Sequence, residues 1–139
     1  MKIIFLDIDG VLNSNQSKGL DPRFPIDPHL ASHIERIKEN TGAEIVLSSS
    51  WRHSDEGISA VEKYIGKIHD ITPTVDNGFR GDEINAYLDN HPNITQHAII
   101  DDSSDFHPDQ PLFQISAEEG LTEEVADDIA AHFASEKYD

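Results

Sequence analysis

The sequence contains no cysteine, which excludes a disulfide framework and any zinc site built on thiolates. Basic residues are scarce as well: 10 Lys and Arg stand against 27 Asp and Glu, for a formal net charge of −17. A chain this acidic is not expected to bind nucleic acid or anionic membrane through a broad basic surface, although it can still hold a local basic pocket. No stretch approaches the roughly 18 consecutive apolar residues of a membrane span.

The N-terminal run MKIIFLD has too short an apolar part for a signal peptide, and an acid interrupts it. Together with the missing cysteines, this run predicts a cytoplasmic protein that makes no membrane contact. At 139 residues, the default expectation is a single domain that spans residues 1–139.

Short apolar runs alternate along the chain with segments whose apolar residues recur at helical spacing. Asp27 and Pro28 form a helix-start signal, and Gly42 is expected to end that helix. This alternation predicts an α/β fold, with a three-layer, Rossmann-like and mostly parallel sheet that carries helices on both faces. The expected strands are residues 2–7, 44–47, a short piece within 68–75, 98–100 and 112–115, and further helices are expected to begin near Ser54, Glu83 and Thr122.

Polar residues follow three of the predicted strands at the point where each strand ends. Asp7 and Asp9 follow the first strand, Ser48 follows the second, and Asp101–Asp102 follow a late one. In open parallel sheets, ligands bind beyond the carboxyl ends of the strands. The sequence therefore predicts that these side chains collect at one edge of the sheet.

The pair Asp7 and Asp9 indicates a metal site with reactive carboxylates. On an extended segment, residues two apart share a face, so the two carboxylates are expected to point the same way. Like charges so close are costly unless a cation lies between them, and carboxylate oxygens suit Mg²⁺. A carboxylate can also attack phosphorus and form an aspartyl-phosphate. Gly10 permits the sharp turn that follows.

Four segments, taken in order, resemble the motifs of the haloacid-dehalogenase-like (HAD) superfamily. FLDIDGVLN resembles the first motif, with Asp7, and IVLSSSWR resembles the second, with Ser48 at the end of its strand. FRGDEINAYL resembles the third, with Arg80 as its basic residue, and AIIDDSSD resembles the fourth, with Asp101 and Asp102. The set is most similar to the small HAD domains of RNA-repair proteins. This resemblance implies a HAD-like fold with a minimal cap or none.

The resemblance also implies an activity, a Mg²⁺-dependent hydrolysis of phosphoric monoesters through an aspartyl-phosphate, and a role for each residue. Asp7 would be the nucleophile, and Asp9 the general acid and base, with a backbone carbonyl that also binds Mg²⁺. Ser48 would donate a hydrogen bond to a phosphate oxygen, and Arg80 would neutralise developing charge. The implied metal ligands are Asp7, Asp9, Asp101 and Asp102.

The candidate substrate-binding residues are Gly10, Ser49 and Arg52. Ser49 competes with Ser48, since a register slip of one residue would exchange the faces on which their side chains lie. Arg52 has two readings, either as a ligand of a second phosphate or as half of a structural ion pair.

Two further choices stay open in the same region. Lys63 and Lys67 are rivals of Arg80 for the cationic role, although a solvated helix face explains both lysines. Trp51 is either a packing residue or a platform on which a base stacks, and packing is the favoured interpretation.

The segments available for a cap, residues 13–28 and 52–79, are too short for a folded domain, so the site is expected to be open. Open members of the superfamily tend to act on macromolecules, which makes a nucleic-acid end a candidate substrate beside a nucleotide or another phosphate ester. The alternative is a non-catalytic or receiver-like phosphate- and Mg²⁺-binding module that acts with a partner protein. The non-catalytic module fits less well because it would be expected to have lost Asp7 or Asp9, and both are present. The receiver-like module fits less well because its acid pair would follow the first strand and its phosphorylated Asp a later one, whereas here Asp7 and Asp9 follow the first strand and Asp101–Asp102 a late one.

Overall fold

A five-stranded, fully parallel sheet forms the centre of the computed structural model, which describes residues 1–136. The strand order is β3-β2-β1-β4-β5, and every neighbouring pair is parallel. The sheet therefore meets the α/β expectation and is more uniform than the mostly parallel one predicted. The strands are β1 (Lys2–Leu6), β2 (Glu44–Leu47), β3 (Asp70–Ile71), β4 (Gln96–Asp101) and β5 (Leu112–Gln114).

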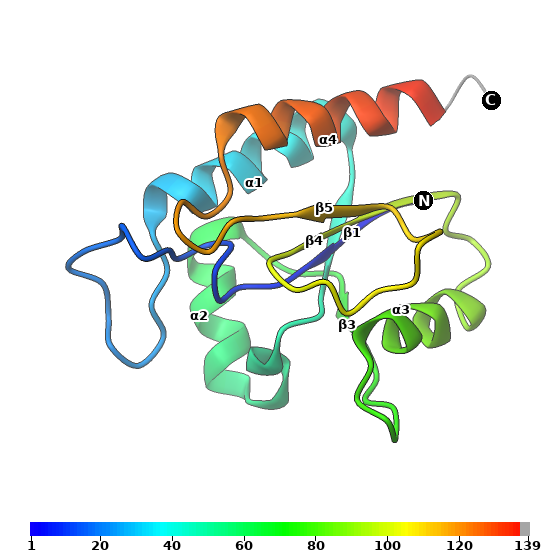
Figure 1. Ribbon diagram of the computed structural model, residues 1–139, viewed down its shortest axis with the longest axis horizontal. Coiled ribbons are helices and arrows are strands. Elements are labelled where there is room, and N and C mark those ends of the chain that lie inside the picture. The colour runs from blue at the N-terminus through cyan, green and yellow to red at the C-terminus, as the bar shows by residue number, and fades with distance from the viewer. Residues whose placement is uncertain (137–139) are drawn as a thin grey trace.

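Helices cover both faces of this sheet, as Figure 1 shows for α1 and α4 on one face and α3 on the other. The first face carries Ile4 and Leu6, which pack in one cluster with α1, α2 and α4. The second face carries Ile3 and Phe5, which pack with α3. The helices are α1 (Pro28–Thr41), α2 (Asp55–Ile65), α3 (Arg80–Asp89) and α4 (Glu123–Glu136), with a 3₁₀ turn η1 at Ser50–His53. None of them, within the described residues, is long and apolar enough to cross a membrane.

Local signals set several helix ends where the sequence predicts them. The Asp27 carboxylate accepts from the His29 backbone N–H at 3.0 Å, and Gly42 ends α1 with a φ of 73°. The Thr122 hydroxyl accepts from the Val125 N–H at 3.2 Å at the start of α4.

Helix α3 begins at Arg80, three residues earlier than the predicted start at Glu83. No side chain caps it, so a local signal is missing. Contacts with the loop after β4 hold its first turn instead: the Gly81 N–H donates to the Asp105 carbonyl at 3.0 Å. The second contact joins His107 Nε2 to Asp82 Oδ1 over 2.6 Å.

The topology creates a crevice position between β1 and β4. From β1 the chain moves outward through β2 to β3, and it then returns to place β4 on the other side of β1. Such a reversal of strand order is where open α/β sheets bind ligands. The loop of residues 13–27 that follows β1 contains no helix or strand, and its ends are joined by a 2.7 Å hydrogen bond from the Asp27 N–H to the Leu12 carbonyl. The described residues thus include no folded cap over this position.

Candidate active site

The register of the central strands brings polar residues from three strands together. Leu6 pairs with Leu47 on one side and with Ile100 on the other. The next residue of each strand is polar: Asp7 donates its N–H to the Ile100 carbonyl at 3.0 Å, and Ser48 donates its N–H to the Leu6 carbonyl at 2.9 Å. Asp7 therefore lies between Ser48 and the end of β4.

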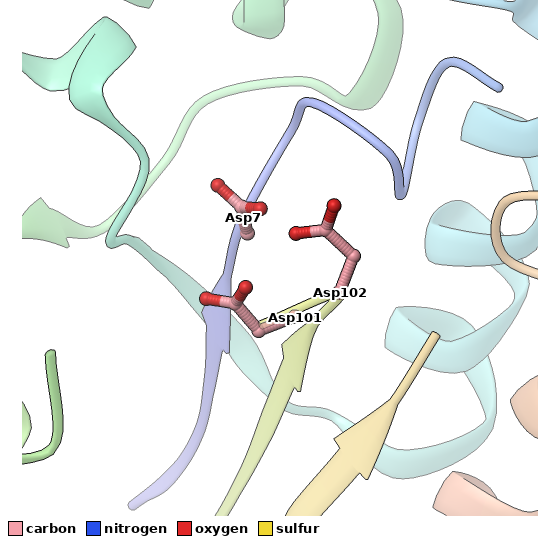
Figure 2. Close-up of side chains that lie close together, drawn as sticks. All are labelled: Asp7, Asp101 and Asp102. Carbon is pink, nitrogen blue, oxygen red and sulfur yellow. The ribbon is translucent and has the colours of Figure 1, made fainter. Parts of the chain in front are cut away.

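Three carboxylates form a cluster at this point. Each of Asp7, Asp101 and Asp102 offers an oxygen within 4.8 Å of the other two. Figure 2 shows the three side chains gathered where β1 and β4 end. Asp7 is 3% exposed and Asp101 is fully buried, so both carboxylates are shielded from bulk water.

One guanidinium group compensates part of this charge. Arg80 Nη1 lies 3.0 Å from Asp7 Oδ1 and 2.7 Å from Asp101 Oδ2. The rival lysines do not share this position: Lys63 Nζ lies over the Tyr64 ring at 5.7 Å, and Lys67 lines a cavity beside Glu44 at the opposite end of β2. Arg80 is thus the one of the three candidate cations that reaches the carboxylates.

The protonation equilibria reflect burial first and the neighbouring charges second. Burial, reinforced by the Asp101 carboxylate, raises the pKa of Asp7 to about 7, although Arg80 opposes the shift. Burial raises the pKa of Asp101 as well. For Arg80, burial alone would lower the pKa, but Asp7 and Asp101 outweigh burial and raise it, so the guanidinium stays charged. The cluster is therefore short of positive charge.

The donor set fits a metal ion. The cluster holds three carboxylates, of which Arg80 contacts two, and carboxylate oxygens are the ligands that hard divalent cations such as Mg²⁺ prefer. Burial and, after it, repulsion from Asp101 favour protonation of Asp7, and a cation among the carboxylates would offset that repulsion. Within residues 1–136 this is the one group of three or more potential ligands at such spacing.

Gly10 gives Asp102 its space. Gly10 has a φ of 82°, and a Cβ atom there would collide with the Asp102 carboxylate. Its N–H donates to Asn13 Oδ1 at 2.9 Å. The structure thus uses Gly10 to admit a carboxylate, while its predicted contact with substrate stays a prediction.

The Asp9 carboxylate lies outside the cluster of three. Strand β1 ends at Leu6, and a helical turn follows in which the Leu12 N–H donates to the Ile8 carbonyl at 2.8 Å. Asp9 therefore does not continue the strand alternation, and its carboxylate is not one of the three that gather with Asp7. Its predicted role as a metal ligand stays a prediction. The Asp9 side chain is exposed and accepts hydrogen bonds from Trp51 and Asn13 instead.

The two candidate serines have different surroundings. Ser49 Oγ accepts from the Trp51 backbone N–H at 3.2 Å and caps η1. Ser48 Oγ is buried and has no hydrogen-bond partner in the part of the chain that the structure describes. Since buried hydroxyls are normally paired, the unpaired Ser48 hydroxyl is the one of the two that is available to a ligand.

Arg52 forms a buried ion pair, which supports the structural one of its two readings over the binding of a second phosphate. The Arg52 side chain is 5% exposed and meets the Glu83 carboxylate at 3.2 Å, which is the structural ion pair of the alternative reading. It also donates to the carbonyls of Ser48, Ser49 and Thr72 at 3.0 to 3.1 Å. These partners occupy its donors and join the ends of β2 and β3 to the first turn of α3.

Asn13 is a site residue that the sequence interpretation missed. Its side chain bonds both Asp9 and the Gly10 N–H. The available signal was its place in FLDIDGVLN, four residues after Asp9, since a helical turn brings residues at that spacing together.

The comparison with protein families gives one match: the family described as the HAD domain in Swiss Army Knife RNA repair proteins covers residues 3–126. The chain belongs to this HAD family. No curated protein and no solved structure matches it. The match spans all four motif segments, from Asp7 to Asp102, and supports a small HAD-like domain of the hydrolase superfamily.

The buried pair of Arg52 and Glu83 leads to a stability prediction. Arg52→Met would leave the Glu83 carboxylate buried without its charge partner, so we expect the free energy of unfolding to fall by about 3–5 kcal/mol. Urea denaturation, followed by circular dichroism, measures the change.

The matched control is the double variant Arg52→Met, Glu83→Gln. It removes both charges while keeping an acceptor for the Val75 N–H, which donates to Glu83 Oε2 at 3.3 Å. We expect it to be more stable than the single variant. A single variant that loses less than about 1 kcal/mol would contradict the structural role of Arg52.

Proposed function

We propose that the protein is a Mg²⁺-dependent phosphoric-monoester hydrolase that works through a phosphorylated Asp7. The observation that carries this proposal is the contact of Arg80 with both Asp7 and Asp101 inside a cluster of three carboxylates. In a solvated acidic patch, Asp7 would be exposed and no guanidinium would bridge the carboxylates. Here Asp7 is buried and Arg80 contacts both Asp7 and Asp101. The family match supports the hydrolase class, and the phosphatase chemistry is our inference from the site.

In the first step, an oxygen of Asp7 attacks phosphorus, and the bond from phosphorus to the leaving oxygen breaks. The leaving oxygen takes the bonding electron pair and a proton from Asp9. Arg80 and the Ser48 hydroxyl donate to the non-bridging oxygens, where negative charge is held in the transition state. The products are an alcohol and an aspartyl-phosphate.

In the second step, water attacks the phosphorus of the aspartyl-phosphate and gives a proton to Asp9, while the bond to Asp7 breaks. Inorganic phosphate leaves, and Asp7 is regenerated as a carboxylate. Asp7, Asp101 and Asp102 would hold Mg²⁺, which when bound supplies positive charge toward the phosphate oxygens.

The substrate we propose is a phosphate ester whose leaving group stays outside the site, such as the end of a nucleic acid. Two observations support this choice: no folded cap covers the site among residues 1–136, and the matching family is described by RNA repair. The net charge of −17 implies that such a substrate is held at its terminal phosphate rather than along its backbone. Assays with 5′- and 3′-phosphorylated oligonucleotides against mononucleotides would separate the substrate classes.

The nucleophile is tested with Asp7→Asn. We expect the unmodified protein to release phosphate from p-nitrophenyl phosphate with MgCl₂ and not with EDTA. We expect Asp7→Asn to lower kcat by about 10³-fold or more, since an amide cannot form the covalent intermediate.

Thermal unfolding is the control for this variant. Because burial and the Asp101 charge both disfavour an ionised Asp7, the metal-free Asp7→Asn protein should melt no lower than the unmodified one at neutral pH. Retained turnover by this variant would refute Asp7 as nucleophile, and no turnover by folded unmodified protein at any Mg²⁺ concentration would refute the phosphatase.

Metal binding is expected to depend on pH through Asp7. Its pKa in the folded protein, about 7, lies above the ordinary 3.8, so ionisation of Asp7 opposes folding. Without metal, the stability tied to its protonation is complete below about pH 4 and is lost as the pH rises to about 7. Since Mg²⁺ binds ionised carboxylates, we expect saturating MgCl₂ to raise Tm by roughly 5–10 °C at about pH 8 and by much less at about pH 5.

Two variants make the thermal measurement specific. Asp102→Asn should remove most of the Mg²⁺-dependent rise in Tm, whereas Asp109→Asn, at an exposed acid of the loop after β4, should keep it. An equal rise in both variants would place the metal elsewhere.

A further inference from the structure

Both oxygens of the Asp9 carboxylate are held by side chains from different parts of the chain. Trp51 Nε1 donates to Asp9 Oδ2 at 3.1 Å, and Asn13 Nδ2 donates to Asp9 Oδ1 at 3.1 Å. Asp9 itself is exposed. An exposed aspartate would otherwise exchange among rotamers, so the two donors fix a side chain that its own packing leaves free.

The two donors are themselves fixed. Trp51 is 9% exposed, and its ring meets the Phe24 ring edge to face at a centroid distance of 5.3 Å. The amide of Asn13 is fully engaged, because Oδ1 accepts from the Gly10 N–H at 2.9 Å and Nδ2 also donates to the Pro25 carbonyl at 2.9 Å. Phe24 and Pro25 are neighbours in the loop of residues 13–27, so this loop supports both donors.

We propose that Trp51 and Asn13 are positioning residues that hold the Asp9 carboxylate in place for proton transfer to the leaving group. The proposal rests on the proposed function and adds residues to it. Each carboxylate oxygen has two lone pairs, so one hydrogen bond per oxygen leaves a site for the transferred proton. Trp51 thereby gains a role that neither packing nor base stacking describes.

The step that depends on this positioning is the first one. The bond from phosphorus to the leaving oxygen breaks, and the leaving oxygen takes the electron pair and the proton of Asp9. p-Nitrophenolate is a stable anion that leaves without the proton, whereas an alkoxide needs it. A misplaced Asp9 should therefore slow an alkyl phosphate far more than p-nitrophenyl phosphate, since general acid catalysis contributes about 10²–10⁴-fold only where it is required.

The decisive variant is Trp51→Phe, which keeps an aromatic ring beside Phe24 and removes the N–H donor. We expect kcat/KM for glycerol 2-phosphate to fall about tenfold or more, and kcat/KM for p-nitrophenyl phosphate to fall less than about threefold. kcat/KM reports the step in which the leaving group departs, so slow hydrolysis of the aspartyl-phosphate cannot hide the difference. Asn13→Ala should likewise lower kcat/KM for glycerol 2-phosphate more than for p-nitrophenyl phosphate. This second variant tests the proposal if Trp51→Phe does not fold.

The matched control is Tyr87→Phe, which also deletes a donor to a carboxylate, that of Asp70, over 3.0 Å. Tyr87→Phe should change kcat/KM for both substrates by the same factor or leave both values unchanged. Equal losses on both substrates in Trp51→Phe, or no loss on either, would overturn the positioning role. Absence of turnover by the unmodified protein would instead overturn the proposed function, and the role with it.

A second readout is independent of activity. Trp51 is the only tryptophan, so its indole N–H gives a single cross-peak in a ¹H–¹⁵N spectrum. Asp9→Ala should move that peak, whereas Asp109→Ala should not. An unmoved peak in Asp9→Ala would show that the hydrogen bond is not formed in solution.

Discussion

Strand β1 lies in the middle of the sheet, and its register with β2 and β4 governs the site. Leu6 pairs with Leu47 and with Ile100, so the residues that follow these three positions meet beyond the sheet. Backbone hydrogen bonds from Asp7 to Ile100 and from Ser48 to Leu6 carry the alignment one residue further. Because the apolar residues of β1 pack into a different cluster on each face, a slip of one residue would move each of them to the opposite face and disrupt both clusters.

Charge balance is the second constraint, and contacts far from the carboxylates maintain it. Asp7 and Asp101 are buried together, which raises the pKa of both groups, and Arg80 is the cation that meets them. Arg80 is the first residue of α3, and two contacts hold the first turn of this helix. The loop after β4 accepts a hydrogen bond from the Gly81 N–H, and the Arg52–Glu83 ion pair joins α3 to the end of β2. A scaffold of this kind can hold the groups of the candidate site in place, although the described residues include no cap domain.

Local and periodic signals in the sequence were enough to predict the fold and the residues at the strand ends. Alternating apolar segments gave the α/β fold, and polar residues at strand ends gave Asp7, Ser48 and Asp101–Asp102 at one edge. What the sequence did not reveal depends on distant partners. Arg52 is buried in an ion pair with Glu83, which lies 31 residues further along the chain. The direction of Asp9 follows from the end of β1 at Leu6 and from a donor 42 residues away.

The proposed function depends on phosphorylation of Asp7, and reductive trapping tests this step most directly. Borohydride reduces an acyl phosphate to an alcohol, so a phosphorylated aspartate is recovered as homoserine. The protein would be quenched during turnover of p-nitrophenyl phosphate with MgCl₂, reduced, digested and sequenced by mass spectrometry. We predict homoserine at position 7, and none there in Asp7→Asn. Homoserine at position 9, 101 or 102 instead, or at no aspartate during verified turnover, would contradict the covalent mechanism.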